Sequence, residues 1–263
     1  MSFYSQDEYT ARFEWGLRGL EELCPVSDVV IIVDVLSFTT GVDVATSRGA
    51  IVFPYRMNDD TTEEFAKKVN AQLAVSRKNM DKQNPFSLSP RSLMQCKSCD
   101  RIIVPSLNGA TLSKIASAKC ANVIAGCLRN AQLVAKKAES LGEKIAVIAA
   151  GESWGYEEGH LRPAFEDLIG AGAILGYLQQ SRSLSPEAMA AVGAFNIVSA
   201  KIEKSLMDCS SGRELREKGF EDDIRVAAQY NASHTVPMIV DGAFIDVYEL
   251  DGKGERDEEE VVY

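Results

Sequence analysis

The sequence is poor in the residues from which several kinds of functional site are built. Among its 263 residues, only His160 and His234 are histidines, which excludes a histidine-rich metal site. Cations are also few, since 28 Lys and Arg stand against 38 Asp and Glu, a net charge of −10. Affinity for nucleic acid comes mainly from neutralising phosphates with Lys and Arg, so nucleic acid is not an expected partner. A small anionic substrate is compatible with this charge where local cations or a metal offset it.

Long apolar runs are missing as well. No stretch approaches the roughly 18 apolar residues of a membrane span, and residues 1–15 have neither a basic start nor an apolar centre. We therefore expect no membrane partner, no secretion signal and a cytoplasmic protein. In the cytosol the six cysteines are expected to be reduced and mostly buried: Cys24, Cys96, Cys99, Cys120, Cys127 and Cys209.

Several motifs that would assign a chemistry are absent. The pair Cys96 and Cys99 has CxxC spacing but no second CxxC and no nearby histidine, which argues against a zinc or redox site. No GxGxxG follows a strand, and no GxxxxGK precedes Ser or Thr, so nucleotide-dependent chemistry loses support. The Asp-x-Asp-x-Thr of haloacid-dehalogenase phosphatases is absent too, because Leu36 follows Asp34 at the position of the second Asp.

Short apolar runs alternate with amphipathic stretches, a pattern typical of βαβ units and a mostly parallel sheet. Strands are predicted at Val29 to Val35, Ile51 to Tyr55, Arg101 to Pro105, Asn122 to Gly126 and Lys144 to Ala150. Helices are predicted at about 40–48, 61–75, 110–119, 130–141, 165–180, 186–194, 196–207 and 220–230. The fold class is therefore α/β, a mostly parallel sheet flanked by helices, with a smaller C-terminal α+β lobe.

The chain is expected to form two closely packed parts. Residues 1–160 would form the sheet domain, and residues 161–263 a lobe of helices and a hairpin, turning at Asp241-Gly242, packed on it. Met80 to Ser92 and Gly151 to Pro163 are predicted as long loops, of the kind that are usually functional or mobile. Gly252 to Glu260 is predicted as a frayed acidic tail.

The carboxyl ends of the predicted parallel strands indicate where a ligand binds, because open parallel sheets bind ligands outside that edge. Four groups of residues follow strands and should converge there: Asp34, then Ser106 to Gly109, then Arg129 and Asn130, then Gly151 to Ser153. Thr39 and Thr40 would open a helix whose free N–H groups and hydroxyls suit an anion, and Asp34 would supply a hard oxygen ligand for Mg²⁺.

Each of these residues also has a purely structural interpretation. Asp34 could be a hydrogen-bonded strand end and Thr39 a helix cap. The turn at Asn108-Gly109 could be chosen for backbone shape alone. Glu166 and Asp167 lie in the first turn of a predicted helix, where acids favour the helix dipole without any function.

A family resemblance covers nearly the whole chain, about 28–247. It rests on motifs in the same order and at similar spacing: Asp34-Val35-Leu36, Thr39-Thr40, Asn108-Gly109, Arg129-Asn130-Ala131, Ala150-Gly151, Phe165-Glu166-Asp167-Leu168-Ile169-Gly170-Ala171-Gly172, Ser211-Gly212-Arg213-Glu214-Leu215, Asp223 and Val236-Pro237. Together they resemble the 2-phosphosulfolactate phosphatase family. The resemblance implies a Mg²⁺-dependent phosphatase that hydrolyses 2-phosphosulfolactate to 3-sulfolactate in coenzyme M biosynthesis.

The resemblance, together with the expectation that ligands bind at the carboxyl ends of parallel strands, predicts the site residues. The catalytic candidates are Asp34, Glu166 and Asp167, with Asp34 and Asp167 as metal ligands. Asp34 would bind the metal or position the attacking group, and Glu166 or Asp167 would complete the metal shell or act as base. The substrate-binding candidates are Thr39, Thr40, Arg77, Ser89, Asn108, Gly109, Arg129, Asn130 and Arg213.

Three positions depart from the family pattern. The family usually has Arg where this chain has Ser37, Glu where it has Ser76, and Asn where it has Leu88. Losing one charge-assisted contact to an anion costs about 1.5–3 kcal/mol, which is roughly ten- to a hundredfold in binding. The alternative hypotheses are a catalytically altered paralogue that binds a small anionic acid, and an interaction protein whose acidic tail contacts a partner. A homodimer is also expected for an enzyme of this size.

Overall fold

The computed structural model describes residues 2–56, 60–154 and 160–248 of the chain. Within them, nine strands form one sheet in the order β1-β7-β2-β6-β10-β11-β3-β5-β4. Their bounds are β1 Ala11–Trp15, β2 Val29–Val33, β3 Ile51–Tyr55, β4 Gln72–Leu73, β5 Arg101–Pro105, β6 Asn122–Gly126, β7 Ile145–Ala149, β10 Pro237–Val240 and β11 Ala243–Asp246. The predicted acidic tail lies outside the described residues, as does part of the loop predicted at Gly151 to Pro163.

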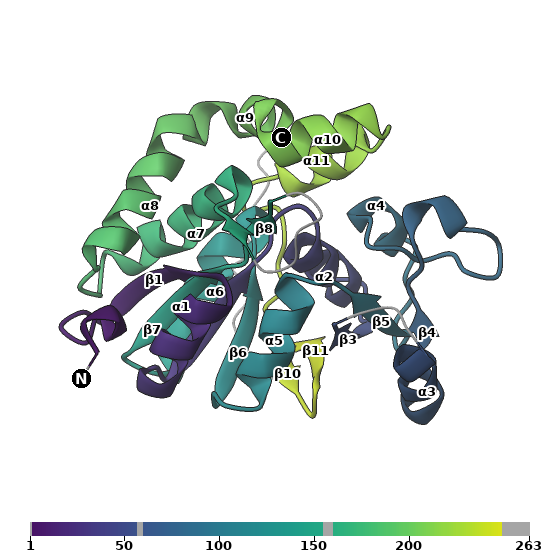
Figure 1. Ribbon diagram of the computed structural model, residues 1–263, viewed down its shortest axis with the longest axis horizontal. Helices are drawn as coiled ribbons and strands as arrows, with labels where there is room; N and C mark the ends of the chain where they lie inside the picture. Colours follow the sequence, from purple (N-terminus) through teal and green to yellow (C-terminus); the bar gives the residue numbers. More distant parts are fainter. Residues whose placement is uncertain (1, 57–59, 155–159, 249–263) are drawn as a thin grey trace, which may run out of the picture.

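Helices cover both faces of the sheet, which confirms the predicted α/β class (Figure 1). Their bounds are α1 Gly16–Leu23, α2 Phe38–Thr46, α3 Asp60–Val69, α4 Pro90–Leu93, α5 Gly109–Ser117, α6 Ala131–Leu141, α7 Phe165–Leu178, α8 Pro186–Val198, α9 Ile202–Asp208, α10 Ser210–Glu217 and α11 Glu221–Ala227. Short 3-10 turns lie at Phe3–Ser5, Cys24–Val26, Arg77–Asn79, Leu128–Asn130 and Ser199–Lys201.

Strand β2 shows why the sheet is buried on both sides. All five of its residues are buried, and alternate side chains point to opposite faces. Val29, Ile31 and Val33 pack with residues of α6, α7 and α8, whereas Val30 and Ile32 pack with residues of α1 and α5. A continuous apolar run is typical of a parallel strand in such a three-layer arrangement, as predicted.

The C-terminal hairpin does not lie where the sequence suggested. It was expected in a smaller lobe against the sheet, but β10 pairs antiparallel with β6, and β11 pairs antiparallel with β3. The hairpin thereby joins the two parallel halves of the sheet, β1-β7-β2-β6 and β3-β5-β4. Pairing of this kind satisfies strand edges that would otherwise be open. The division of the chain at residue 160 stays a prediction.

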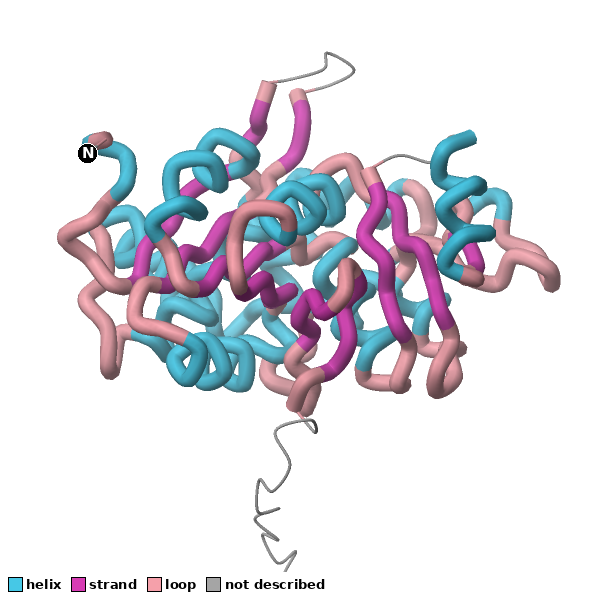
Figure 2. The backbone as a smooth tube through the Cα atoms, turned by 90° about the horizontal axis from the view of Figure 1, so that it is seen from below, coloured by secondary structure: helices cyan, strands magenta, loops and turns pink. Residues whose placement is uncertain are grey.

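Other differences are local. Strand β1 and helices α1 and α10 were not predicted, and the helix predicted over 61–75 ends at Val69, before β4. Arg12 and Glu14 interrupt the apolar pattern of β1, yet Arg12 is fully buried and donates hydrogen bonds to Ser5 and Val26 carbonyls. The short antiparallel pair β8 (Glu152–Ser153) and β9 (Leu161–Arg162) stands apart from the main sheet (Figure 2).

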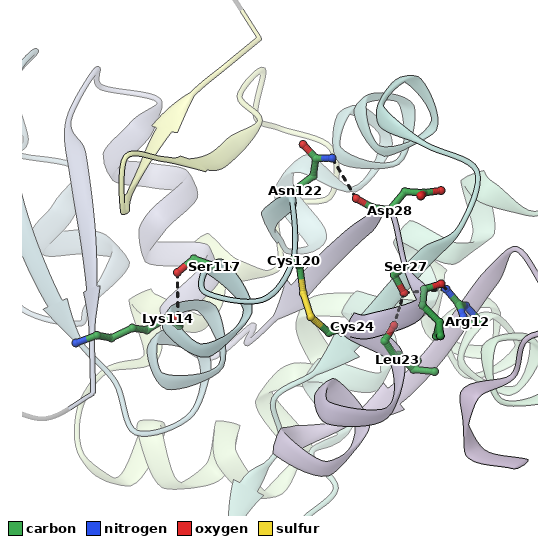
Figure 3. Close-up of a disulfide and its surroundings, with 10 residues drawn as sticks. Arg12, Leu23, Cys24, Ser27, Asp28, Lys114, Ser117, Cys120 and Asn122 are labelled. Carbon is green, nitrogen blue, oxygen red and sulfur yellow. Dashed lines mark hydrogen bonds between the residues drawn. A yellow bond between two sulfur atoms is a disulfide. The ribbon is translucent and has the colours of Figure 1, made fainter. Parts of the chain in front are cut away.

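The cysteines differ from the expectation of six free thiols. Cys24 and Cys120 form a disulfide that joins the turn after α1 to the turn before β6, and their Cα atoms are 6.0 Å apart (Figure 3). The fold brings these two ends together because α1 and α5 pack side by side on one face of the sheet. Cys96, Cys99, Cys127 and Cys209 are free. Among the described residues, no helix has the length and apolar character needed to cross a membrane.

Candidate active site

The carboxyl end of β2 carries Asp34, which is almost fully buried. One carboxylate oxygen, Oδ2, accepts a hydrogen bond of 2.9 Å from the Gly109 N–H, and Oδ1 accepts one of 3.3 Å from the Phe38 N–H. The Ser106 hydroxyl lies 3.5 Å from Oδ2. Asp34 is therefore held by the first residues of α2 and of α5, the two helices that begin beside the end of β2.

Gly109 permits this close contact. A Cβ atom at position 109 would lie 2.5 Å from Phe38 Cδ1 and 2.6 Å from Asp34 Oδ2, distances at which atoms overlap. Only a residue without a side chain lets the α5 N-terminus donate to the carboxylate. Asn108, the residue before it, donates from Nδ2 to Glu152 Oε2 over 3.1 Å.

Asp167 joins the same edge from the first turn of α7. Its Oδ1 accepts a 2.7 Å hydrogen bond from the Val35 N–H, and its Oδ2 accepts a 2.9 Å bond from the Gly151 N–H. This side chain therefore connects the ends of β2 and β7. Glu166 is also buried, and its Oε2 lies 3.5 Å from the Cys209 thiol.

Four carboxylates thus gather at one end of the sheet: Asp34, Glu152, Glu166 and Asp167, here called the acidic cluster. Burial raises the pKa of Asp34 to about 6, although hydrogen bonds from Gly109 and Phe38 lower it, and the charge of Glu166 raises it further. Burial and the charges of Asp34 and Glu166 also raise the pKa of Glu152, to about 7. For Asp167, burial and the same two charges raise the pKa well above its usual value. The members of the cluster are close enough to repel one another electrostatically.

Sequence reasoning did not nominate Glu152 as a site residue. The expectation that ligands bind at the carboxyl ends of parallel strands did place Gly151 to Ser153 at this edge. The position of Glu152 shortly after β7 could therefore have identified it. Arg162 was not nominated either. Its charge lowers the pKa of Glu152, and its guanidinium donates to the Ser211 hydroxyl on α10 over 3.0 Å.

A second cluster lies beside the start of α2. Arg77 Nη2 donates to the Ser37 hydroxyl over 2.8 Å, and Arg77 is paired with Asp223 Oδ2 at 3.1 Å. The Ser89 hydroxyl donates to Asp223 Oδ1, and the Arg77 guanidinium stacks 4.9 Å from the centre of the Phe220 ring. This Arg77–Asp223 clamp, made of Ser37, Arg77, Ser89 and Asp223, connects the loop after β4 to α2 and α11. Two of its members, Arg77 and Ser89, were predicted substrate-binding residues.

The predicted threonines are engaged within the turn after β2. Thr39 and Thr40 are fully buried. The Thr39 hydroxyl donates to the Asp34 carbonyl over 2.8 Å and accepts from the Asp34 N–H over 3.0 Å. The Thr40 hydroxyl donates to the Val35 carbonyl over 2.8 Å. Both hydroxyls therefore bond to the backbone of the turn, as expected if these threonines have a structural role. That both residues bind substrate stays a prediction.

Arg129 and Asn130 lie among structural contacts. Arg129 Nε donates to Asp43 Oδ2 over 2.8 Å, and the pair is buried between α2 and the C-terminal helices. The Asn130 side chain accepts from the Cys127 N–H and donates to the Ala125 carbonyl. Neither has a described contact with the acidic cluster.

Arg213 is exposed on α10 and lines a cavity of about 410 Å³ together with Lys201, Lys204 and Cys209. Cys209 also contacts Glu166, so this cationic cavity lies next to the acidic cluster. Arg213 is thus placed near the site, although it does not touch Asp34 in the contacts described.

Comparison with known proteins agrees with the resemblance drawn from the sequence. The family model of 2-phosphosulpholactate phosphatase matches residues 19–242. This chain belongs to the 2-phosphosulfolactate phosphatase family. The match covers the acidic cluster and the Arg77–Asp223 clamp, and it confirms the family to which the motifs pointed.

Individual relatives within this phosphatase family are distant but extensive matches. A "Probable 2-phosphosulfolactate phosphatase" of Thermotoga maritima is 30% identical over 220 residues, which cover 82% of this chain and 90% of the relative. A "2-phosphosulfolactate phosphatase" of Methanothermobacter thermautotrophicus is 25% identical over 217 residues, covering 82% and 88%. A further "Probable 2-phosphosulfolactate phosphatase", from Caldanaerobacter subterraneus, is 26% identical over 224 residues.

Proposed function

We propose that this member of the family is a Mg²⁺-dependent phosphomonoester hydrolase that converts 2-phosphosulfolactate to 3-sulfolactate and phosphate, or hydrolyses a closely similar phosphorylated acid to its own hydroxy acid and phosphate. The observation that carries the proposal is the acidic cluster. Burying several carboxylates close together opposes folding, and proteins retain such arrangements mainly at functional sites. The family match and the names of the relatives support the phosphatase chemistry.

The donor set of the cluster fits a hard divalent cation. All its members offer carboxylate oxygens, the ligands that Mg²⁺ prefers, and their mutual repulsion would be relieved by a cation. Within the part of the chain that the structure describes, no three or more His, Cys, Asp or Glu side chains are spaced so that they could hold a metal ion together. Asp34 and Asp167 are the proposed metal ligands, with Glu166 beside them. When bound, Mg²⁺ would offset charge on the phosphoryl oxygens and the leaving oxygen.

The residues of the chain would orient the substrate and the attacking water and would accept the proton of that water. In the hydrolysis, a water oxygen forms a bond to phosphorus, the ester P–O bond breaks with its electron pair passing to the leaving oxygen, and a carboxylate takes the water proton. A base works best with a pKa near the working pH, and the pKa of Glu152, at about 7, meets that condition. We therefore add Glu152 to Glu166 and Asp167 as a candidate base.

Two places next to the acidic cluster could bind the negative charges of the substrate. The N-terminus of α2 and the Arg77 guanidinium lie together through the Ser37 contact, and suit a phosphoryl group. The cationic cavity with Arg213, Lys201 and Lys204 is adjacent to Glu166 through Cys209. Such cations would attract the remaining acid groups of the substrate.

One observation favours the second candidate function, a paralogue that binds a small anionic acid without hydrolysing it. The charge of Arg77 is paired with Asp223, and Ser37 replaces the arginine usual in the family. Fewer free cations at the start of α2 would leave the phosphoryl group less stabilised during transfer.

Phosphate release from a panel of 2-phospho acids, with Mg²⁺ or with EDTA, distinguishes the two. We expect turnover of 2-phosphosulfolactate with Mg²⁺, loss with EDTA and a loss of at least about a hundredfold in Asp34→Asn. Asp241→Asn is the matched control, because Asp241 is exposed in the hairpin turn at a positive φ of 50°, which Asn tolerates. Absence of turnover with every substrate, together with a ligand-induced rise in melting temperature, would support the binding protein instead.

A further inference from the structure

Arg162 is a half-buried arginine beside the acidic cluster. In the ribbon of β8 and β9 it lies directly opposite Glu152. Residues opposite one another in an antiparallel pair project from the same face, with Cβ atoms about 4.5–5.5 Å apart. Glu152 accepts a hydrogen bond from Asn108 at the start of α5, so this face of the ribbon is turned toward the cluster. Arg162 therefore extends into the same region as Glu152.

The guanidinium of Arg162 is held at the start of α10. Its Nη2 donates to the Ser211 hydroxyl over 3.0 Å, and Ser211 is buried in the first turn of that helix. Cys209, two residues earlier, has its thiol 3.5 Å from Glu166 Oε2. Arg162 thus stands between Glu152 and the segment that contacts Glu166, next to two members of the acidic cluster.

The charge of Arg162 is available to a ligand. The other two arginines predicted to bind substrate near the sheet are already engaged, since Arg77 is paired with Asp223. Arg129 is paired with Asp43. Arg162 forms no ion pair among the residues that the structure describes, and its hydrogen bond there goes to a hydroxyl. A guanidinium carries five N–H donors, so most donors of this side chain can bind an anion.

Burial distinguishes Arg162 from the other cations nearby. Lys201, Lys204 and Arg213 line the cationic cavity and are exposed, so solvent screens their charges. A half-buried cation acts through less solvent and stabilises a bound anion more strongly. Arg162 is therefore the cation of this region best placed to determine which anion binds.

The position of Arg162 fits the sulfonate group of the substrate. Asp34 and Asp167, the proposed metal ligands, would hold Mg²⁺ and with it the phosphoryl group. In 2-phosphosulfolactate the sulfonate is on the carbon next to the one that carries both the phosphate ester and the carboxylate. Arg162 lies beside Glu152 and touches neither proposed metal ligand in the described part of the chain, so it would meet the more distant acid group. A guanidinium fork binds the oxygens of such a group through two parallel hydrogen bonds.

We propose that Arg162 binds this sulfonate and determines the preference of the protein for 2-phosphosulfolactate over 2-phospholactate, the same phosphorylated acid without a sulfonate. The proposal rests on the proposed function, because it assigns a residue to one group of the same substrate. Arg162 would affect KM rather than kcat, since its contact with the sulfonate is the same in the bound substrate and in the transition state.

Steady-state kinetics of Arg162→Gln with the two substrates test the proposal. Glutamine is polar but uncharged. KM for 2-phosphosulfolactate should rise about ten- to a hundredfold, the effect of losing charge-assisted hydrogen bonds. KM for 2-phospholactate, and kcat for both substrates, should change by less than about threefold at the pH optimum of each variant.

Two further variants separate the charge of Arg162 from a structural effect. Arg162→Lys keeps the charge without the fork, so KM for 2-phosphosulfolactate should rise less than in Arg162→Gln. Arg216→Gln is the matched control, because it removes an exposed cation of α10 that donates to the Met207 carbonyl, and it should behave as the wild type. Melting temperatures of all the variants check that the fold is intact.

Calorimetry tests the same contact without turnover. With Mg²⁺ present, the wild type should bind 3-sulfolactate at least about tenfold more tightly than lactate, and Arg162→Gln should bind the two alike. If the wild type hydrolyses neither phosphorylated acid but shows this Arg162-dependent preference, the proposed function is wrong and the sulfonate contact stands.

Three results would overturn the role of Arg162. The first is a wild type that hydrolyses 2-phosphosulfolactate while Arg162→Gln keeps the same preference over 2-phospholactate. The second is an equal loss of kcat for both substrates with a shifted pH profile, which would mean that Arg162 acts through the proton affinity of Glu152. The third is a wild type that binds 3-sulfolactate no more tightly than lactate.

Discussion

Glycine 109 determines how the carboxylate of Asp34 is held. The α5 N-terminus donates its first N–H to Asp34 Oδ2, and it can approach this closely because no side chain stands between them. The same contact lowers the pKa of a carboxyl group that burial raises. The orientation of Asp34 is thus coupled to the packing of a helix that begins 75 residues later.

Gly109→Ala should therefore displace Asp34. The added methyl group overlaps Phe38 and the carboxylate, so we expect a loss of stability of about 1–3 kcal/mol and a fall in phosphate release of at least about tenfold. Urea unfolding and steady-state kinetics measure the two effects. Gly176→Ala is the control, because its methyl group meets no atom and alanine favours the helix interior. Wild-type activity in Gly109→Ala would show that the contact does not position Asp34.

Glu152 allows a pH-dependent test of the acidic cluster. The pKa of this carboxyl rises from 4.5 to about 7 on folding, mainly through burial and then through the charges of Asp34 and Glu166. A group with a raised folded pKa contributes stability below its unfolded pKa, and that stability is lost as pH rises through the folded pKa. Glu152 therefore destabilises the folded protein increasingly between about pH 4.5 and 7.

Glu152→Gln should remove this penalty, because glutamine keeps an oxygen that can accept from Asn108 and carries no charge. We expect the variant to be more stable than the wild type by about 1–2 kcal/mol at pH 8 in the absence of divalent metal, and about equal at pH 4. Urea unfolding at the two pH values measures the difference. Equal stabilities of the variant and the wild type at pH 8 would mean that burial and the charges of Asp34 and Glu166 do not destabilise the Glu152 carboxylate.

At the scale of elements, the Arg77–Asp223 clamp joins three parts of the chain that are remote in sequence. Arg77 lies in a 3-10 turn after β4, Asp223 in α11, and Ser37 at the start of α2. Asp223 is 3% exposed and Arg77 17%, so solvent screens their ion pair only partly. The clamp holds the loop with Ser89 against the end of β2 where the acidic cluster lies.

A double-mutant cycle should show coupling between Arg77 and Asp223. Arg77→Ala leaves a buried carboxylate without its cation, so we expect a loss of about 2–4 kcal/mol, with a coupling energy to Asp223→Ala of about 1–3 kcal/mol. The exposed pair Arg225 and Glu221 on α11 is the comparison, and its coupling should be below about 1 kcal/mol. Urea unfolding of the four variants of each cycle measures both. A coupling for Arg77 no larger than that of the surface pair would contradict the role of the clamp.

Across the whole molecule, the disulfide is the covalent link between distant segments. Cys24 and Cys120 are separated by 96 residues, and their bond joins the elements that precede β2 and β6 (Figure 3). Closing so long a loop restricts the unfolded chain strongly.

Cys24→Ser should lower the free energy of unfolding by about 2–4 kcal/mol under oxidising conditions. With a reducing agent present, the difference from wild type should shrink to the effect of the serine itself. Cys99→Ser is the control, because Cys99 is exposed and free, and it should change nothing in either condition. A difference that is the same with and without reductant would contradict the disulfide.

The sequence by itself determined the α/β class and five parallel strands of the sheet, β2, β3, β5, β6 and β7, because an apolar run and its flanking turn are local properties. It also determined the family, and it placed Asp34 at the sheet edge, because the end of a strand can be read from its own residues. The predicted helix starts at Phe165 and Pro186 were also correct, and the acidic first turn of α7, with Glu166 and Asp167, is a local feature of this kind.

Only the tertiary structure decided which of the nominated side chains meet. It joined Asp34 to Gly109, Arg77 to Asp223 at a separation of 146 residues, and Arg129 to Asp43 rather than to the acidic cluster. It also placed the β10–β11 hairpin inside the sheet and paired Cys24 with Cys120. Such contacts depend on how whole elements pack, and no local pattern of residues specifies the partner of a side chain that lies a hundred residues away.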